Sequence, residues 1–306
     1  MQTKSATLFK SQKINVSVVQ YQMLPITSWD EVENNVRLLT QQAYADEPHF
    51  LLFPEYFSIH YFECLPPEWA EKEKLDALIE KYDQYIQLFR SLANENQCYI
   101  IGGSFPVRAE DGKIYNVAHL FSPSGGVYTQ EKLHITPLER QTWNYSSGNK
   151  VKLFDTPYAR IGIQICYDIE FPEVTRLMAL NGVDILFTPF FTGDRFGYQR
   201  VRYSAQARAV ENTIYSVISG STANLTLSKI SCYSQSAILT PSDVGFPLDA
   251  VLIEAGSGIG TVISASLDLV LLHDKRLLGT VRPLMDRRED LYSLNLQSEI
   301  EIEIVE

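Results

Sequence analysis

Glu55 is the first residue in this 306-residue chain whose type and position could support catalysis. It follows the apolar run His49-Phe50-Leu51-Leu52-Phe53 and Pro54. Open α/β sheets place ligand-facing groups just beyond the carboxyl ends of their buried strands. Burial there would raise the pKa of a carboxyl group and suit it to general-base catalysis. Glu55 is therefore a candidate general base, and the alternative is an acid that caps a neighbouring helix.

Cys166 is the candidate nucleophile, because it ends an apolar strand-like run and precedes a predicted helix that starts near Glu173. An elbow between a strand and a helix exposes a nucleophile and directs backbone N–H groups at the atom under attack. The alternative is a buried apolar role, which is the usual one for a free cysteine. Cys64 and Cys98 fit that alternative better, since one lies in a predicted loop and the other begins a strand.

Lys132 could supply the fixed positive charge that a cysteine nucleophile needs, since none of the five histidines is a clear partner by sequence. It lies near the end of a predicted hairpin, in which strands over 113–122 and 127–135 flank Pro123-Ser124-Gly125-Gly126. An ammonium group at that position could stabilise both a thiolate and an oxyanion. The alternative is an ordinary exposed strand lysine.

The elements that must position these residues alternate between strand and helix patterns. We expect strands over 14–20, 49–53, 98–102, 161–166, 183–187 and 214–219, and helices over 28–45, 75–94, 173–181 and 198–211. Such alternation, together with a hairpin, predicts an α/β protein with a mixed sheet. The chain has no internal repeat and no Pro/Ser-rich linker, so one main domain is expected.

The composition excludes several classes of function. Lys and Arg number 26 against 37 Asp and Glu, and the net charge of −11 argues against nucleic acid as a partner. No apolar run approaches the roughly 18 to 20 residues that span a bilayer, so no membrane partner is expected. The four cysteines lack zinc or redox spacing. Residues 1–13 lack the apolar core of a signal peptide. We therefore expect a cytoplasmic protein.

Three motifs that contain the candidates occur in the order Phe53-Pro54-Glu55-Tyr56, then Glu131-Lys132-Leu133-His134-Ile135, then Ile165-Cys166-Tyr167-Asp168. Together they resemble the motifs of the nitrilase superfamily of carbon–nitrogen hydrolases, whose catalytic set is Glu, Lys and Cys in this order. The similarity extends over about residues 14–267. Tyr167-Asp168 looks like the amidase-type branches of that superfamily.

The resemblance implies a four-layer α-β-β-α sandwich with two mixed sheets. It implies that Cys166 is the nucleophile, Glu55 the general base and Lys132 the oxyanion stabiliser, aided by the backbone N–H of Tyr167. Glu139 resembles a second glutamate of the site, the alternative being a surface acid paired with Arg140. The mechanism requires no metal or cofactor. For substrate binding, the sequence suggests an aromatic wall and a pocket lining made of Tyr61, Phe190 and Thr192.

The function implied is hydrolysis of a small linear amide to a carboxylate and ammonia. Hydrolysis of nitriles or carbamoyl-amines and acyl transfer remain open, as do a non-catalytic scaffold or binding protein and a redox-sensing thiol protein. We expect a polar arm over 1–12, a hydrolase domain over 13–268 and a tail over 269–306 that packs on the domain or on a partner subunit. Because members of the superfamily usually pair, a homodimer or higher homo-oligomer is expected.

Overall fold

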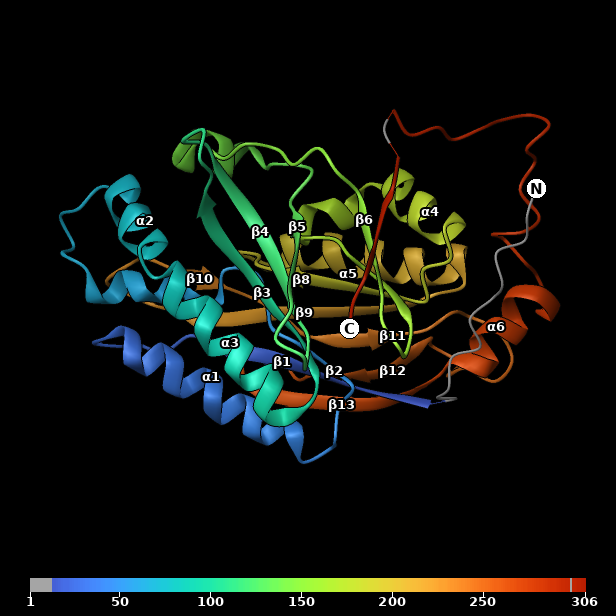
Figure 1. The fold of residues 1–306 in the computed structure, drawn as a ribbon, viewed down its shortest axis with the longest axis horizontal. Helices are drawn as coiled ribbons and strands as arrows, with labels where there is room; N and C mark the ends of the chain where they lie inside the picture. Colours follow the sequence, from blue (N-terminus) through green and yellow to red (C-terminus); the bar gives the residue numbers. More distant parts are fainter. Residues whose placement is uncertain (1–12, 298) are drawn as a thin grey trace.

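Two β-sheets form the centre of the computed structural model, which describes residues 13–297 and 299–306 (Figure 1). The first sheet has the order β13-β1-β2-β3-β4-β5 and the second has the order β12-β11-β9-β8-β7-β6-β14, with β10 paired to β9. They join through a short parallel pairing of β1 and β9, at Tyr21 with Ser221 and Gln22 with Thr222. Each sheet contains both parallel and antiparallel pairs, as the sequence predicts.

The strands and helices alternate along most of the chain. The first sheet consists of β1 (Lys13–Gln22), β2 (Phe50–Leu52), β3 (Tyr99–Arg108), β4 (Ile114–Phe121), β5 (Val127–Glu131) and β13 (Thr261–Asp268). The second contains β6 (Lys152–Asp155), β7 (Arg160–Ile163), β8 (Ile185–Phe190), β9 (Tyr215–Asn224), β10 (Ser231–Cys232), β11 (Ala237–Leu239), β12 (Val251–Glu254) and β14 (Glu301–Ile304). The helices are α1 (Trp29–Tyr44), α2 (Glu71–Ile79), α3 (Tyr82–Asn96), α4 (Pro172–Leu180), α5 (Arg195–Asn212) and α6 (Leu269–Leu278).

Apolar residues on both faces of the strands explain the four layers. In β2 and the residue after it, Phe50 and Leu52 pack into the core shared with the second sheet, whereas Leu51 and Phe53 pack against the core that contains α1 and α3. Successive strand residues point to opposite faces, so an uninterrupted apolar run must be covered on both sides. On the far side, α4 and α5 cover the second sheet. The predicted α-β-β-α sandwich is confirmed.

Several predicted element boundaries differ from the observed ones, and two of the differences affect the candidates. The strand before Cys166 ends at Ile163, so Cys166 begins a short 3₁₀ helix, η3 (Cys166–Glu170), instead of ending the strand. The second hairpin strand ends at Glu131, and Lys132 directly follows it. The helix predicted over 75–94 is two helices, α2 and α3, which are separated at Glu80 and Lys81.

The C-terminal residues of the described structure add a strand to the second sheet of the same chain. The strand β14 pairs in parallel with β6 at the edge of the second sheet, and the C-terminus lies beside it (Figure 1). Glu301 and Glu303 of β14 form ion pairs of 2.7 Å with Lys150 and Lys152. Among the described residues, no helix has the length and apolar character needed to cross a membrane. The arm predicted over 1–12 lies outside the described residues.

Candidate active site

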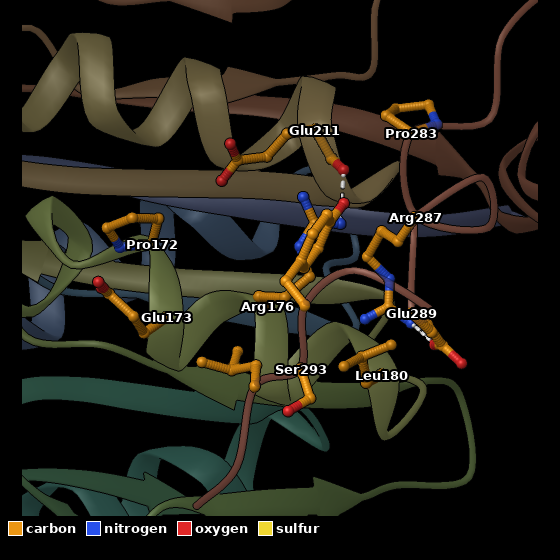
Figure 2. A pocket seen from close by; sticks show the side chains of 11 residues that line it. Pro172, Glu173, Arg176, Leu180, Glu211, Pro283, Arg287, Glu289 and Ser293 are labelled. Carbon is orange, nitrogen blue, oxygen red and sulfur yellow. Dashed lines mark hydrogen bonds and ion pairs between the residues drawn. The ribbon is translucent and has the colours of Figure 1, made fainter.

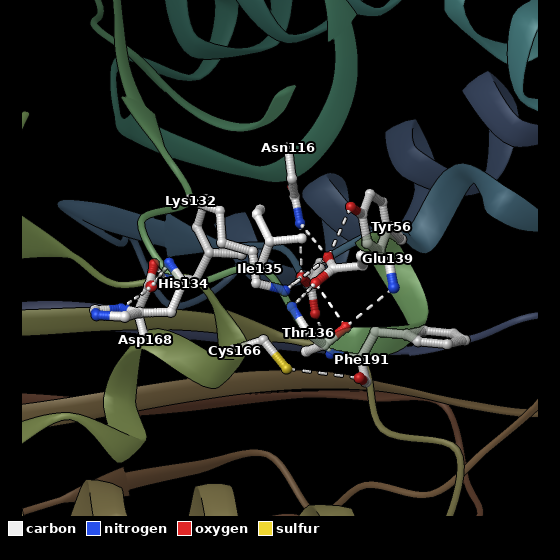
Figure 3. Close-up of polar contacts among 12 residues, drawn as sticks. Tyr56, Asn116, Lys132, His134, Ile135, Thr136, Glu139, Cys166, Asp168 and Phe191 are labelled. Carbon is white, nitrogen blue, oxygen red and sulfur yellow. Dashed lines mark hydrogen bonds and ion pairs between the residues drawn. The ribbon is translucent and has the colours of Figure 1, made fainter. Parts of the chain in front are cut away.

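Glu55, Lys132 and Cys166 follow the ends of three different strands and meet between the sheets. Glu55 lies three residues beyond β2, where its backbone bridges to Ser104 of β3. Gly103 makes this close approach possible, since a Cβ there would lie 2.0 Å from the carbonyl oxygen of Pro54. Figure 3 shows Lys132, Asn116 and Glu139 pointing toward one another, with the sulfur of Cys166 directed toward Phe191.

Lys132 lies between two carboxylates. Its Nζ is 2.8 Å from Oε1 of Glu55 and 2.7 Å from Oε1 of Glu139, and its side chain is 1% exposed. Burial alone would lower the pKa of Lys132, but the charges of Glu55 and Glu139 outweigh it and hold the pKa well above its usual value. The alternative of an exposed strand lysine is therefore excluded, and Lys132 is a permanently charged group inside the protein.

Glu139 begins a π-helix, η2 (Glu139–Trp143), and is buried in the same cluster. Its Oε1 accepts from Tyr56 Oη at 3.0 Å, and its Oε2 accepts from the backbone N and Oγ1 of Thr136 at 2.9 and 2.8 Å. Burial would raise the pKa of Glu139, but the charge of Lys132 and the hydrogen bonds from Lys132 and Thr136 lower it below the usual value. Glu139 is thus an ionised partner of Lys132 rather than a surface acid paired with Arg140.

The pKa of Glu55 shifts in the opposite direction, although Glu55 contacts the same lysine as Glu139. Its Oε1 accepts from Lys132 and from Asn116 Nδ2 at 2.8 Å, and its Oε2 accepts from the backbone N of Phe191 at 2.8 Å. Burial raises the pKa of Glu55 and the charge of Glu139 raises it further, against the effect of Lys132. Two carboxylates whose pKa values are driven apart can perform different tasks, one as a proton acceptor and one as a fixed charge.

Cys166 occupies a strained position beside this cluster. It has φ of 49°, a left-handed conformation that costs a residue other than glycine about 1–3 kcal/mol. Its Sγ donates to the carbonyl oxygen of Phe191 at 3.6 Å, so Phe191 contacts both Cys166 and Glu55 through its backbone. Burial raises the pKa of the Cys166 thiol well above its usual value, and the charge of Glu55 adds to this. The thiol therefore needs a base in order to become a nucleophile.

Asp168 holds the elbow around Cys166 together and connects it to Lys132. Its carboxylate accepts from the backbone N of Ile165 at 3.2 Å, just before the cysteine. It also accepts from the backbone N–H groups of Leu133 and His134 at 3.2 and 2.8 Å, just after the lysine. The side chain of Asp168 is 1% exposed. A single buried carboxylate thus links the segments that carry two candidate catalytic groups.

The residues suggested for substrate binding contact other parts of the protein. The ring of Tyr61 lies 5.6 Å from the ring of Trp29. The ammonium group of Lys81 lies over the Tyr61 ring, 5.6 Å from its centroid. Phe190 is fully buried, with its ring 6.2 Å from that of Tyr198. Thr192 Oγ1 donates to the carbonyl oxygen of Tyr233 at 2.9 Å. Their role in substrate binding remains a prediction.

Asn116, Tyr56 and Thr136 also belong to the cluster, although they are not among the candidates predicted from the sequence. The signal for Asn116 was present, because it is a polar residue on the strand face that also carries Ala118 and Leu120. The position of Phe191 directly after a buried strand suggested a pocket residue, but its contacts with Glu55 and Cys166 are made by the backbone, which any residue type would supply. Thr136 contacts Glu139 through a turn whose geometry cannot be derived from the sequence alone.

A separate concavity of about 600 Å³ lies between α4 and the segment over 283–294 (Figure 2). Arg176 donates from Nη1 to the carbonyl oxygen of Glu211 at 2.9 Å at its wall, and Arg287 is paired with Glu289. Its lining does not include Glu55, Lys132, Glu139 or Cys166. It is therefore distinct from the buried cluster.

Known proteins resemble this chain in sequence and in fold. The sequence model of the family described as "Carbon-nitrogen hydrolase" matches residues 15–270. The chain is 45% identical over 283 residues to the probable hydrolase YhcX of Bacillus subtilis, covering 92% of this chain and 55% of that protein. It is 30% identical over 290 residues to the omega-amidase NIT2 of Xenopus tropicalis, covering 92% and 98%.

Solved structures agree with this similarity. The NitFhit protein of C. elegans has a TM-score of 0.75 at 22% identity, over 93% of this chain and 67% of that one, which supports the fold. Nit3 of Saccharomyces cerevisiae, a member of the nitrilase superfamily, has a TM-score of 0.68 at 25% identity, over 89% and 96%. The chain thus spans just over half the length of the Bacillus relative but nearly all of the Xenopus omega-amidase.

Proposed function

Because this chain belongs to the carbon–nitrogen hydrolase family, we propose that it cleaves a small linear amide to a carboxylate and ammonia through a thioester on Cys166. The observation that carries the proposal is the buried contact of Lys132 Nζ with both Glu55 and Glu139, beside the thiol. Amide cleavage through a covalent intermediate needs a nucleophile, a group that moves protons and a fixed charge opposite the oxyanion.

Acylation begins when Glu55 takes the proton from Cys166 Sγ and the thiolate attacks the carbonyl carbon of the amide. The negative charge that forms on the carbonyl oxygen is stabilised by Lys132 Nζ and by the backbone N–H of Tyr167. This N–H lies in the first turn of η3, where N–H groups have no acceptor within the helix. Glu55 then gives its proton to the leaving nitrogen, the C–N bond breaks, and ammonia departs from the thioester.

Deacylation uses the same groups on a water molecule. Glu55, again ionised, takes a proton from the water as its oxygen attacks the thioester carbon. Lys132 Nζ and the backbone N–H of Tyr167 stabilise the second oxyanion as well. This intermediate then collapses, and the C–S bond breaks. The proton on Glu55 returns to the sulfur, so the carboxylic acid product leaves and the free thiol is restored. Glu139 stays ionised and holds Lys132 in place, and the proposed steps use no metal or cofactor.

A neutral amide suits the charge of this cluster. Two carboxylates face one ammonium, so the surroundings of Cys166 carry a net negative charge when both acids are ionised. Charge interactions are strong where water is excluded, and this would disfavour an anionic group next to the carbonyl under attack. The omega-amidase name of a relative and the sequence Tyr167-Asp168 also support an amide.

The test is ammonia release from a panel of small amides, ω-amides, carbamoyl-amines and nitriles. The Cys166→Ala variant is the negative control, and Cys98→Ala is the matched control because Cys98 is a buried thiol outside the cluster. We expect release from at least one amide, loss of release in Cys166→Ala and retention in Cys98→Ala. A substrate mass added to Cys166 in intact-protein spectra would identify the thioester.

Three results would replace this proposal with another. Full activity in Cys166→Ala would remove the cysteine from the mechanism. Release only from nitriles or carbamoyl-amines would keep the catalytic set but change the substrate class. A folded wild-type protein that is silent on the panel, and whose Cys166 is not alkylated, would favour a scaffold or binding protein.

We further propose that the chain works as a homodimer or higher homo-oligomer in the cytoplasm. The outer face of α5 supports this, because Phe196, Tyr203 and Val210 recur every seven residues and are 79%, 68% and 38% exposed. Residues spaced by seven share one helix face, and an apolar row of this kind is typical of an interaction surface. A monomeric mass in light scattering at micromolar concentration would contradict this assembly.

A further inference from the structure

Asn116 bridges the same two carboxylate oxygens as Lys132, but without a charge. Its Nδ2 donates to Oε1 of Glu55 at 2.8 Å and to Oε1 of Glu139 at 3.3 Å. Lys132 Nζ contacts these two atoms at 2.8 and 2.7 Å. Asn116 is fully buried in β4, so water does not compete for these bonds. Each shared oxygen therefore has one cationic donor and the neutral donor of Asn116, and Oε1 of Glu139 accepts from Tyr56 Oη as well.

The backbone holds this amide in position. The N–H of Lys132 donates to the carbonyl oxygen of Asn116 at 2.8 Å, so the residue that supplies the neutral donor is bonded to the residue that supplies the cation. The orientation of the amide is determined as well, because turning it over would place Oδ1 against two carboxylate oxygens. Within residues 13–297 and 299–306, Oδ1 has no hydrogen-bond partner. One buried acceptor is thus left unpaired so that the N–H₂ group can face the two acids.

The charges of the cluster explain why a neutral donor matters. One ammonium cannot balance two ionised carboxylates, and the second carboxylate is Glu55, for which burial disfavours the ionised form. Hydrogen bonds to an ionised carboxylate stabilise it relative to the protonated acid. A second cation would do the same but would also make the carboxylate a much weaker proton acceptor. An amide donor stabilises the ion by a smaller amount.

We propose that Asn116 is a positioning residue that keeps Glu55 in its proton-accepting form while leaving it basic enough to deprotonate Cys166. This inference rests on the proposed function of Glu55 as the general base. Several other titratable groups surround Glu55 in this site, and all of them would be retained when Asn116 is changed: Lys132, Glu139, Cys166, Tyr56 and Tyr145.

The experiment compares the pH dependence of wild type with that of Asn116→Leu and Asn116→Asp. Leucine has a similar size but no donor, and aspartate keeps the shape but replaces the N–H₂ group with an oxygen. Asn212→Leu is the matched control, since Asn212 is also fully buried with an unpartnered Oδ1 but bonds to Arg208 in α5. Two readouts are used, kcat/KM for ammonia release and the rate at which iodoacetamide alkylates Cys166, located by mass spectrometry.

In Asn116→Leu we expect the acid limb of both pH profiles to move to higher pH by about one unit, as for the loss of one hydrogen bond to an ionised group. In Asn116→Asp we expect a larger shift, because a third acid joins the cluster. Asn212→Leu should keep the wild-type limb even if it is less stable. If Asn116→Leu does not fold, Asn116→Asp decides the question alone.

Acid limbs in the Asn116 variants that coincide with that of wild type would overturn the inference, even if their rates fall. A failure of the proposed function looks different, because wild type would then release no ammonia. Alkylation of Cys166 needs no substrate, so the shift of its acid limb would still test the role of Asn116.

Discussion

The carboxylate of Asp168 accepts two hydrogen bonds from His134, one from its backbone N–H and one from ring Nδ1, both at 2.8 Å. The His134 ring also stacks on Phe171 with centroids 3.7 Å apart. Since Lys132 lies two residues before His134 and Cys166 two residues before Asp168, this contact sets the separation of the proposed oxyanion group and the proposed nucleophile. The positions of Lys132 and Cys166 are therefore coupled through the hydrogen bonds between His134 and Asp168.

Replacing Asp168 should weaken both catalysis and stability. In Asp168→Asn one oxygen of the buried acceptor becomes a donor that faces backbone N–H groups. We expect the free energy of unfolding to fall by about 1.5–3 kcal/mol, as for the loss of hydrogen bonds to a charged group. We expect kcat to fall by up to about 10²-fold through misplacement of the proposed catalytic groups. Urea unfolding and steady-state kinetics measure these effects, with the exposed Asp46→Asn as the control. Unchanged kcat in Asp168→Asn would contradict the coupling.

Removing the charge of Lys132 should destabilise the protein in a pH-dependent way. Lys132→Met leaves two buried carboxylates without their cation, a change that costs about 3–5 kcal/mol near neutral pH. Without the cation the pKa values of Glu55 and Glu139 in the folded state rise above those of the unfolded chain. The protonated acids are tolerated, so the deficit should shrink as the pH falls toward the unfolded value of about 4.3. Urea unfolding at pH 7.5 and pH 5 tests this, and an equal deficit at both pH values would exclude the explanation.

The pH at which kcat/KM falls on the acid side should lie above the usual pKa of a glutamate. Glu55 accepts protons only when ionised, and burial together with the charge of Glu139 raises its pKa. Activity should therefore be lost as the pH falls through this raised value rather than near 4.3. In Glu55→Gln we expect the rate to fall by at least about 10²-fold and the acid limb to disappear from the residual activity. An acid limb that persists in Glu55→Gln would assign it to another group.

Thiol alkylation should distinguish Cys166 from the other buried cysteines. Burial raises the pKa of Cys98 and of Cys232 to about 12, and neither has a carboxylate base beside it in the described structure. We expect iodoacetamide to modify Cys166 first at pH 7.5, with substrate giving protection. In Glu55→Gln the alkylation of Cys166 should slow by about tenfold or more. Equal rates for Cys166 and Cys98 in wild type would contradict a base-assisted thiol.

The packing of the C-terminal strand can be tested with two adjacent residues. Val305 is 1% exposed and belongs to the core, whereas Ile304 is 77% exposed. We expect Val305→Ser to lower the free energy of unfolding by about 1.5–3 kcal/mol, as for loss of a buried apolar side chain. Ile304→Ser should change it by less than about 0.5 kcal/mol. Because β14 pairs with β6 of its own chain, the difference should not depend on protein concentration.

Local patterns in the sequence predicted an α/β protein with a mixed sheet, and the resemblance of the three motifs to those of the nitrilase superfamily implied the four-layer sandwich. An apolar run such as 49–53 is typical of a strand covered on both faces, and polar groups at the ends of such strands can face a ligand. Glu55, Lys132 and Cys166 follow from motifs that each span only a few residues, and Glu139 follows from the resemblance to the family.

Only the tertiary structure decided which atoms meet. The pairing of β4 with β3 and the packing of one sheet on the other bring Asn116 and the backbone of Phe191 to Glu55, from 61 and 136 residues away. The π-helix at Glu139 turns its carboxylate toward Lys132, and the turn at Asp168 joins two motifs. Strand register and sheet stacking depend on the summed burial of many residues across both cores, which no short segment encodes.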